Sequence, residues 1–508
     1  MREFDLVVVG SGVGLTVLNQ AINAGWDCAL VEDAKMGGTC LTRGCIPSKV
    51  LVYPADVVRE AQRAERVGLK LKLEKVDWDV VARRMWSQID ESKQIDEGLA
   101  TVPNLVVYRG VGRFVGEYEM EVDLNRGGTS DRFRGKRFVI ASGARSVVPP
   151  IQGLQEAGYV TSETFFGDKF PAKPWKSLAI VGGGIIAAEF AHVFSAFGTE
   201  VTIVEMLPRL LTTEEPEISL FVERNFRRHM KVLLGHRAVA AKKGKGGKVL
   251  VVEDVETKQR SEVRAEEIFV AAGRRSNADL LQVERTGVET DRHGWIKTNQ
   301  YLETTKPNVW CVGDANGKYQ FRHKANYDAE VVINNLFGSP EQKRAVDYSA
   351  VPWAIFTHPQ VAHVGMTQAE AQAAGHQIYV AIKHYSSVAK GFAMGYERGD
   401  VDDGFVKLVV DKSYRILGAH VVGPHAAALV QPFVYLMNAG FTCAPPPEQR
   451  EGIPLSKMSF ACPEAGSFMP IYRAMVIHPS INEVTGWAIG NLRPVGDHGH
   501  AHGHAHEH

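Results

Sequence analysis

The strongest constraint on the fold is a pattern that the chain contains twice: an apolar strand, a glycine-rich turn, a helix, a second apolar strand and then an acid. The first copy covers residues 6–32 and the second covers residues 178–205. In such a unit the glycines let the backbone approach a pyrophosphate at the helix N-terminus, and the acid accepts hydrogen bonds from ribose hydroxyls. Two copies in one chain therefore predict two dinucleotide-binding folds and two dinucleotides.

The two copies differ in how closely they match the dinucleotide fingerprint. In the first copy Leu15 occupies the last glycine position of GxGxxG, so the interpretation depends on the strand, the helix and the acid around the turn. The second copy is a complete GxGxxA that ends at Ala187. The residues expected to contact nucleotides are Gly10, Gly12, Gly14 and Glu32 in the first copy, and Gly182, Gly184 and Glu205 in the second.

Glu205 also bears on which nicotinamide dinucleotide the second fold would bind. A carboxylate at this position can accept from a free 2′-hydroxyl but would repel a 2′-phosphate, which favours NAD over NADP. Arg209 lies four residues later and weakens this preference, because a guanidinium attracts a phosphate. A solvated charge at the end of a strand remains the structural alternative for Glu205.

Residues 37–49, with the sequence GGTCLTRGCIPSK, contain two cysteines whose spacing suits redox chemistry. Cys40 and Cys45 come within disulfide reach if the backbone coils between them, and Pro47 suits the first turn of a helix. Cys45 should thus lie at or near a helix N-terminus, where the dipole favours a thiolate. A plant-type iron–sulfur cluster would need another cysteine where the chain has Ser48. Two unrelated buried cysteines remain the alternative.

The composition narrows the class of protein. A chain of 508 residues exceeds one hydrophobic core and predicts three or four domains. Lys plus Arg and Asp plus Glu both total 58, so the overall charge does not point to nucleic acid or an anionic membrane as a partner. No apolar run is long enough to cross a bilayer, and six cysteines are too few for a disulfide framework. We therefore expect a cytoplasmic protein.

The cysteine segment resembles the redox signature of the class I pyridine nucleotide disulfide oxidoreductase family, with Thr42 where that family commonly has Asn. Four further segments resemble parts of the same family, namely the exit from its flavin domain, its second closing strand, its second FAD fingerprint and the opening of its dimerisation domain. In that order they are residues 138–150, 269–277, 304–314 and 356–365. The resemblance covers nearly all of residues 1–490.

This resemblance implies an α/β fold of the glutathione-reductase type, with two Rossmann-like dinucleotide-binding domains and an α+β C-terminal dimerisation domain. The implied divisions are an FAD-binding domain with the redox disulfide at 1–150, an NAD-binding domain at 151–280, a central domain that completes the FAD site at 281–348, and the dimerisation domain at 349–490. Residues 442–470 are interpreted as an insertion that carries Cys443 and Cys462. The His-rich residues 491–508 are expected to form a disordered tail able to chelate metal.

The resemblance also implies roles for individual residues. Lys49 and Glu189 are expected to pair beside the flavin ring, and Ile185 to lie where the nicotinamide stacks. His478 and Glu483 are expected to form the catalytic base and its acid, supplied across the dimer interface to the partner's cysteines, although a His-Pro turn by itself is more often structural. The remaining expected cofactor contacts, together with Lys49, are Gly38, Thr39, Ser142, Gly143, Gly273 and Asp314.

The implied function is an FAD-dependent dithiol/disulfide oxidoreductase that works as a homodimer without a catalytic metal. Residues 205–209 and 183–186 resemble dihydrolipoamide dehydrogenase, and residues 52–57, 186–192 and 276–281 resemble mycothione reductase. We expect the first activity, with a lipoyl group as substrate, because NAD selectivity suits dithiol oxidation. The alternatives are a low-molecular-weight disulfide reductase of the mycothione or glutathione reductase type, and a metal-binding or partner-binding protein with a vestigial redox core.

Overall fold

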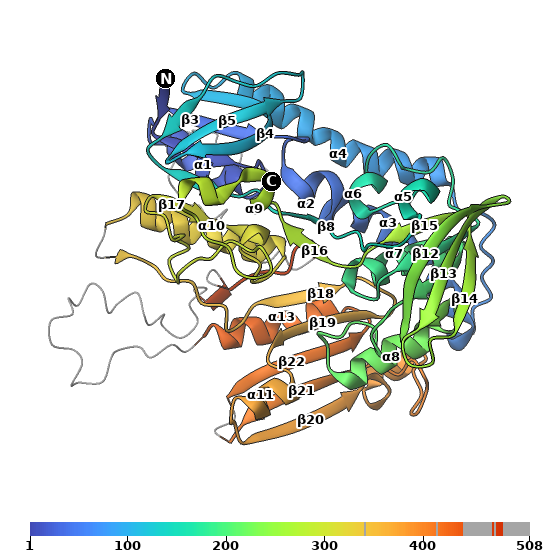
Figure 1. Cartoon of the computed structure of the whole chain (residues 1–508). Helices are drawn as coiled ribbons and strands as arrows, with labels where there is room; N and C mark the ends of the chain where they lie inside the picture. The colour runs from blue at the N-terminus through green and yellow to red at the C-terminus, as the bar shows by residue number, and fades with distance from the viewer. Residues whose placement is uncertain (340–341, 413–414, 440–469, 472–473, 481–508) are drawn as a thin grey trace, which may run out of the picture.

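A computed structural model describes residues 1–339, 342–412, 415–439, 470–471 and 474–480 of the chain (Figure 1). The expected insertion lies outside these residues except for position 470, and so do Cys443, Cys462, Glu483 and the His-rich tail. Within the described residues, no helix combines the length and the apolar character needed to cross a membrane. In Figure 1 the N-terminal sheet and the C-terminal sheet lie at opposite ends of the molecule.

The first glycine turn belongs to an eight-stranded sheet. Its strand order is β1-β6-β5-β4-β3-β2-β7-β17. The bounds are β1 Arg2–Phe4, β2 Leu6–Val9, β3 Cys28–Glu32, β4 Leu105–Gly116, β5 Glu119–Leu124, β6 Phe133–Gly135, β7 Phe138–Ile140 and β17 Val309–Cys311. The strands β2, β3, β7 and β17 pair in parallel and are buried, as their continuous apolar runs predict. β17 comes far later in the chain than its neighbour β7, so a distant segment completes this sheet.

The second glycine turn belongs to a four-stranded parallel sheet with the order β11-β10-β9-β15. The bounds are β9 Ser177–Val181, β10 Glu200–Val204, β11 Lys231–Leu233 and β15 Glu267–Val270. An antiparallel sheet packs beside it, formed by β12 His236–Gly244, β13 Gly247–Asp254 and β14 Arg260–Ala265. Helix α7, Ile185–Ala196, follows the turn and is buried on nearly all sides, which accounts for its apolar sequence.

Helices connect the two nucleotide-binding units. Cys40 lies in α2, Gly38–Arg43, and α3, Cys45–Arg63, packs against α7 of the second unit and against α4, Trp78–Ala100. The cysteines therefore lie between the two glycine turns. The other elements are α1 Gly14–Asn23, η1 Ala64–Val67, β8 Ala144–Ser146, α5 Leu154–Ala157, α6 Ser162–Phe165, α8 Pro216–Phe226, β16 Arg274–Ser276, α9 Ala278–Leu281, η2 Val283–Thr286, η3 Gly313–Asn316 and α10 Arg322–Phe337.

The C-terminal region is a five-stranded antiparallel sheet with the order β18-β19-β22-β21-β20. The bounds are β18 Pro352–Ile355, β19 Gln360–Gly365, β20 Ile378–His384, β21 Phe405–Asp411 and β22 Ile416–Gly423, with α11 Gln368–Ala373, η5 Tyr385–Ser387 and α12 Ala389–Ala393 between strands. Helix α13, Ala426–Met437, packs on β19 and β22. These layers confirm the predicted fold class, while the predicted domain boundaries stay predictions.

Candidate active site

The cysteine segment packs directly on the first glycine turn. Gly37 and Gly38 have φ values of 96° and 66°, in the left-handed region that glycine adopts without strain. A Cβ on Gly38 would lie 2.5 Å from the Cα of Gly12, so the two turns can touch only through glycine. Cys45 is the first residue of α3, in agreement with the prediction from Pro47. The positive end of α3 therefore faces the same space as the nucleotide turn.

The two thiols are half-buried, free and in hydrogen-bonding contact, which is the reduced form of a redox pair. The hydrogen bond from Cys40 is the largest cause that lowers the pKa of Cys45 below its ordinary value. The same contact raises the pKa of Cys40, because the proton is held between the two sulfurs. The charge of Lys49 also favours a thiolate at Cys45. These shifts favour the thiolate at Cys45 and the protonated thiol at Cys40.

The imidazole of His478 contacts the thiol of Cys40. Nε2 of His478 is 3.2 Å from Sγ of Cys40, a distance that permits proton transfer between them. The backbone N–H of His478 donates to Nδ1 of His323 at 3.4 Å, and His323 donates from Nε2 to the Pro352 carbonyl at 2.7 Å. Burial lowers the pKa of His323 to about 4, so this ring stays neutral at pH 7. His323 therefore acts as a fixed acceptor that positions His478.

The expectation that His478 acts across the dimer interface stays a prediction, because the structure describes a single chain. His478 reaches Cys40 of its own chain. Gln431 on α13 holds the segment by donating to the Met475 carbonyl at 3.0 Å and accepting the Ile477 N–H at 3.3 Å.

Lys49 and Glu189 join the two nucleotide-binding units by an ion pair. Nζ of Lys49, on α3, lies 3.0 and 2.8 Å from the two carboxylate oxygens of Glu189 on α7. Glu189 also accepts the Phe356 N–H at 3.0 Å, which ties the pair to the C-terminal region. The carboxylate is 8% exposed and the lysine 22% exposed. The structure thus brings the expected pair together, with a positive charge beside the thiols.

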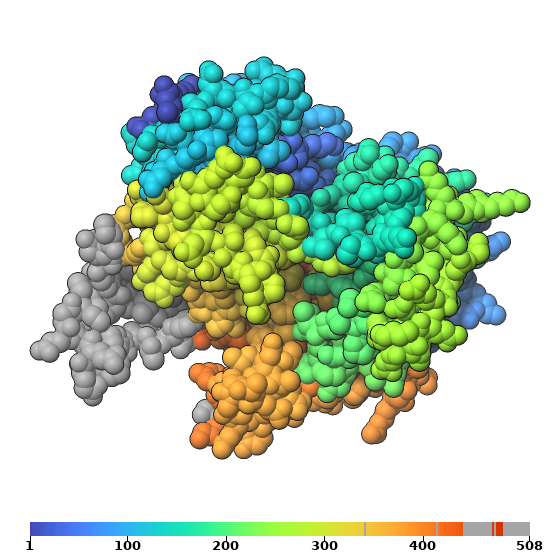
Figure 2. Space-filling view, viewed as in Figure 1, coloured from blue at the N-terminus to red at the C-terminus, as the bar shows by residue number. Residues whose placement is uncertain are grey.

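One cavity of about 1280 Å³ reaches both glycine turns and both cysteines. Figure 2 shows the surface hollowed between the yellow-green and green parts of the chain. The expected site residues that line the cavity are Gly10, Gly12, Glu32, Gly38, Thr39, Cys40, Cys45, Lys49, Ser142, Gly143, Gly182, Gly184, Ile185, Glu189, Glu205, Gly273, Asp314 and His478. Gly14 is not among the lining residues, so its contact with a nucleotide stays a prediction. A Cβ on Gly14 would lie 2.7 Å from Cγ1 of Val8, so this glycine permits close packing of helix on strand.

The two acids predicted to face ribose hydroxyls are buried, and each accepts hydrogen bonds from nearby backbone N–H groups. Glu32 accepts the Ser11 N–H at 2.7 Å and the Ala34 N–H at 2.9 Å. Glu205 accepts the Leu207 N–H at 2.7 Å. Both carboxylates line the cavity and retain lone pairs for further donors. Each acid is therefore placed to accept a hydroxyl from a bound nucleotide.

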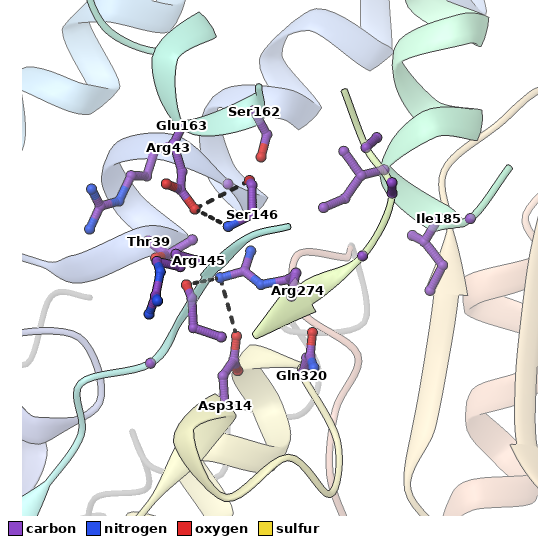
Figure 3. A pocket seen from close by; sticks show the side chains of 18 of the residues that line it. Thr39, Arg43, Arg145, Ser146, Ser162, Glu163, Ile185, Arg274, Asp314 and Gln320 are labelled. Atoms are coloured by element: carbon purple, nitrogen blue, oxygen red, sulfur yellow. Dashed lines mark hydrogen bonds and ion pairs between the residues drawn. The ribbon is translucent and has the colours of Figure 1, made fainter. Parts of the chain in front are cut away.

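Figure 3 shows the part of the cavity around Asp314. This carboxylate lies in η3 just after strand β17, and Nη2 of Arg274 lies 3.7 Å from its Oδ2 (Figure 3). Oε1 of Glu163 accepts the Ser146 N–H at 2.8 Å, which links α6 to β8 (Figure 3). Ile185 is the first residue of α7. The acids and the guanidinium therefore converge on one space from separate elements.

Four buried polar atoms of residues that line the cavity have no hydrogen-bond partner within the described chain. They are Oγ of Ser142, Nε of Arg43, Nη1 of Arg209 and Nε of Arg274. Buried polar groups are nearly always hydrogen-bonded, so these atoms are placed for a ligand rich in oxygen. Together with the glycine turns and helix N-termini, they fit the phosphates and riboses of two dinucleotides.

Three residues at the cavity received no role from the sequence. Arg322 begins α10, and its positive charge favours the thiolate form of both cysteines. Arg274 belongs to a turn that the resemblance had marked, but its contact with Asp314 depends on residues distant in the chain. Glu163 lies in a segment without a motif. None of the three carried a local pattern that predicted its contact.

Two dinucleotide-binding folds that share a cavity with a thiol pair and an imidazole define a nucleotide-dependent dithiol/disulfide oxidoreductase. The sequence matches the family "Pyridine nucleotide-disulphide oxidoreductase" over residues 4–329 and the family's dimerisation domain over residues 351–446. The chain belongs to this family, whose members are FAD-dependent flavoproteins that use a pyridine nucleotide. The dimerisation domain indicates a homodimer.

Named relatives fall into two groups within the family. A mycothione reductase from Mycobacterium tuberculosis (strain ATCC 25618 / H37Rv) is 35% identical over 454 residues, which cover 87% of this chain and 95% of the relative. A dihydrolipoyl dehydrogenase from Chlamydia muridarum is 31% identical over 440 residues, which cover 84% and 89%. The solved structure of the HOCl-induced flavoprotein disulfide reductase RclA from Escherichia coli shares the fold, with a TM-score of 0.73, 24% identity and coverage of 96% and 99%.

Proposed function

We propose that the chain is a dihydrolipoyl dehydrogenase, which oxidises a dihydrolipoyl dithiol with NAD through FAD. The contact of His478 with Cys40, beside a Cys45 that favours the thiolate, carries the dithiol chemistry. The choice of NAD rests on Glu205, which is buried at the end of β10 and lines the cavity. Six cysteines are too few for a disulfide framework, which fits a reducing compartment such as the cytoplasm.

In the proposed reaction the enzyme starts with a Cys40–Cys45 disulfide. His478 accepts a proton from one substrate thiol, and the resulting thiolate attacks Sγ of Cys40, so the disulfide breaks and Cys45 leaves as a thiolate. The second substrate thiol then attacks the substrate sulfur of the mixed disulfide, which closes the substrate disulfide and releases Cys40 as a thiolate. His478 transfers the first proton to this Cys40 thiolate and accepts the proton of the second substrate thiol. FAD, when bound, supplies the route by which the two electrons held by the cysteine pair reach NAD.

The first unit would hold FAD and the second unit would hold NAD. In the first unit, the turn at Gly12 would hold the FAD pyrophosphate, Glu32 and Asp314 would accept from its hydroxyls, and Lys49 would place its charge beside the ring. In the second unit, the turn at Gly184 and the carboxylate of Glu205 would hold NAD, with Ile185 beside the nicotinamide. This division follows from which unit the cysteine segment covers.

A second candidate is the NADPH-dependent reduction of a low-molecular-weight disulfide of the mycothione or glutathione type. The observation that favours it is Arg209, whose Nη1 is buried without a partner in the described chain and which lines the cavity near Glu205. A guanidinium there could bind a 2′-phosphate. The mycothione reductase relative, at 35% identity, supports the same alternative.

Steady-state assays with purified protein distinguish these candidates. We expect kcat/KM for dihydrolipoamide with NAD to exceed the values for mycothione disulfide or glutathione disulfide with NADH or NADPH. The Cys40→Ser variant is the matched control for thiol-independent activity. Preferred turnover of mycothione disulfide with NADPH would replace the proposal by the second candidate. A colourless protein that binds no flavin would favour a vestigial core instead.

We also propose that His478 acts as the base across the dimer interface, on the cysteines of the partner chain, as the resemblance implies. The dimerisation domain at residues 351–446 supports this proposal. Heterodimers that combine a Cys40→Ser chain with a His478→Ala chain test this. If the base acts within one chain, both sites of the heterodimer are defective and its activity stays at the level of the variant homodimers. If the base acts across the interface, one complete site forms and about half of the native activity returns. Activity that stays at the level of the variant homodimers therefore contradicts the proposal.

A further inference from the structure

Two histidines and a glutamate form a buried cluster outside the cavity of the proposed reaction. His363 on β19 and His420 on β22 are directly paired across the antiparallel strands, with ring centres 4.2 Å apart. Glu214, which precedes α8 of the second nucleotide-binding unit, approaches them with Oε2 3.3 Å from Nδ1 of His363. All three residues are at most 2% exposed. None of them lines the nucleotide cavity.

Backbone carbonyls fix the tautomers of both imidazoles. Nε2 of His363 donates to the Gly365 carbonyl at 2.7 Å, and Nε2 of His420 donates to the Met366 carbonyl at 3.0 Å. In the neutral rings the lone pair is therefore on Nδ1 in each case. Nδ1 of His420 is buried and has no hydrogen-bond partner within the described chain. A lone pair in such a position calls for a donor or a cation.

The carboxylate of Glu214 is oriented in the same way. Its Oε1 accepts the Trp353 indole N–H at 2.7 Å, which leaves Oε2 directed at His363. One ligand atom from each member of the cluster, two imidazole nitrogens and a carboxylate oxygen, lies within 4.8 Å of the others. Hydrogen bonds that hold the far side of each ligand are the outer contacts that bound metals require.

The described charged side chains around the cluster do not neutralise Glu214 with a fixed positive charge. Glu215 is also buried beside the cluster, but Lys407 neutralises it at 2.9 Å. Within the described residues, the ion pair of Glu214 is with His363. A buried carboxylate and two lone pairs therefore face one another without a fixed positive charge.

We propose that Glu214, His363 and His420 bind one divalent transition-metal ion of the zinc type, which ties the C-terminal sheet to the second nucleotide-binding unit. Ligands about 2.0 Å from a tetrahedral zinc lie about 3.3 Å from one another, and the Glu214 Oε2 to His363 Nδ1 distance is 3.3 Å. Two imidazoles and a carboxylate suit zinc, with water as the fourth ligand. The site carries no short sequence motif, because its ligands come from three distant segments.

The simpler alternative is a proton on Nδ1 of His363, which would form an ion pair with Glu214. That arrangement satisfies the carboxylate, but it leaves Nδ1 of His420 without a partner. A metal ion satisfies all three ligand atoms at once. The two arrangements therefore differ in metal content and in the dependence of binding on His420.

Metal content of the flavin-loaded protein, grown with added zinc and dialysed against a chelator, tests the site. The six tail histidines, from His498 to His508, are replaced by alanine in all samples, because that tail can chelate zinc by itself. We expect about one equivalent of zinc per chain, and a loss of at least tenfold in the Glu214→Gln, His363→Asn and His420→Asn variants. His192→Asn is the matched control, since His192 is a buried imidazole paired with a single carboxylate, Asp56.

Two results would overturn the site. The first is that the parent protein, with Glu214, His363 and His420 unchanged, retains no zinc, cobalt or other divalent metal after growth with each ion. The second is a His420→Asn variant that holds as much metal as the His192→Asn control. Thermal midpoints with and without added zinc guard against misfolded variants: zinc should raise the midpoint of the parent and the control, and leave the three cluster variants unchanged.

Discussion

The two dinucleotide-binding units have the same glycine turn and differ in what the chain places over it. A Cβ on Gly10 or on Gly182 would lie 2.3 Å from a facing carbonyl oxygen, that of Ala141 or Ala271, and both glycines have positive φ. The turns are therefore equivalent in geometry and in their need for glycine. The sequence pattern alone shows this equivalence.

The units diverge at the second glycine of each turn and after each acid. Gly38 of the redox segment packs on Gly12 in the first unit, whereas a Cβ on Gly184 of the second unit would meet nothing within 4 Å. After its acid the second unit continues into a loop in which Met206 is exposed. A covered turn suits a resident cofactor, and an open turn suits a nucleotide that must exchange. We read the difference as the division between FAD and the nicotinamide dinucleotide.

The largest effect is expected from a substitution in the first unit, whose turn is covered by the redox segment. Cys45→Ser removes the leaving sulfur, so we expect dithiol turnover to fall on the order of 10³-fold or more. Reduction of flavin by the nicotinamide nucleotide, which uses the open unit, should persist in stopped-flow measurements. Cys311→Ala is the control, because that thiol is buried in the core of the first sheet. Equal loss of both half-reactions would break the separation of roles.

The second prediction concerns the ion pair between the units. Glu189→Gln leaves Lys49 facing the cavity without its carboxylate, and we expect a loss of unfolding free energy of up to about 3 kcal/mol, the low end for a buried pair because Lys49 is partly exposed. Denaturation followed by flavin fluorescence measures it. The Lys49→Met, Glu189→Leu double variant should lose less than the two single variants together. Strict additivity would show that the units are not coupled here.

The third prediction concerns the acid of each unit, which is replaced by alanine in separate variants. Glu205→Ala should reduce the preference for NAD over NADP about tenfold, because a repulsion and one hydrogen bond are lost, while flavin content stays unchanged. Glu32→Ala should lower flavin content and leave the nucleotide KM unchanged. Absorbance ratios of purified protein and steady-state kinetics provide the two readouts. If each variant affects both readouts, the two units do not hold separate dinucleotides.

The smallest effect is a shift in a titration. The contact with Cys40 lowers the pKa of Cys45 to about 6, so in the two-electron-reduced enzyme the thiolate is present above that pH and is lost as the pH falls through it. The long-wavelength absorbance that a thiolate gives beside oxidised flavin should follow this curve. Lys49→Met removes a positive charge and should move the midpoint upward. A midpoint near the ordinary thiol value in the parent protein would contradict the assignment.

Local patterns were sufficient for much of the fold and for part of the site. The alternation of apolar strands with glycine turns predicted both parallel sheets, and Pro47 placed Cys45 at a helix start. The residues that needed another source are those whose partners are distant in the chain. Lys49 with Glu189, and His478 with Cys40, were proposed only from the resemblance, and the second pair forms within one chain.

The sequence by itself determined the backbone frame of this protein: the two turns, the cysteine spacing and the acids that end the strands. These features depend on neighbours within a few residues, where φ preferences, burial and helix dipoles act. Tertiary structure alone decided which distant residues come into contact. Examples are the packing of Gly14 on Val8, the hydrogen bonds of Gln431 that hold the His478 segment, and the histidine pair on β19 and β22. Such contacts depend on the packing of whole sheets, because only that packing brings distant segments within reach of a hydrogen bond.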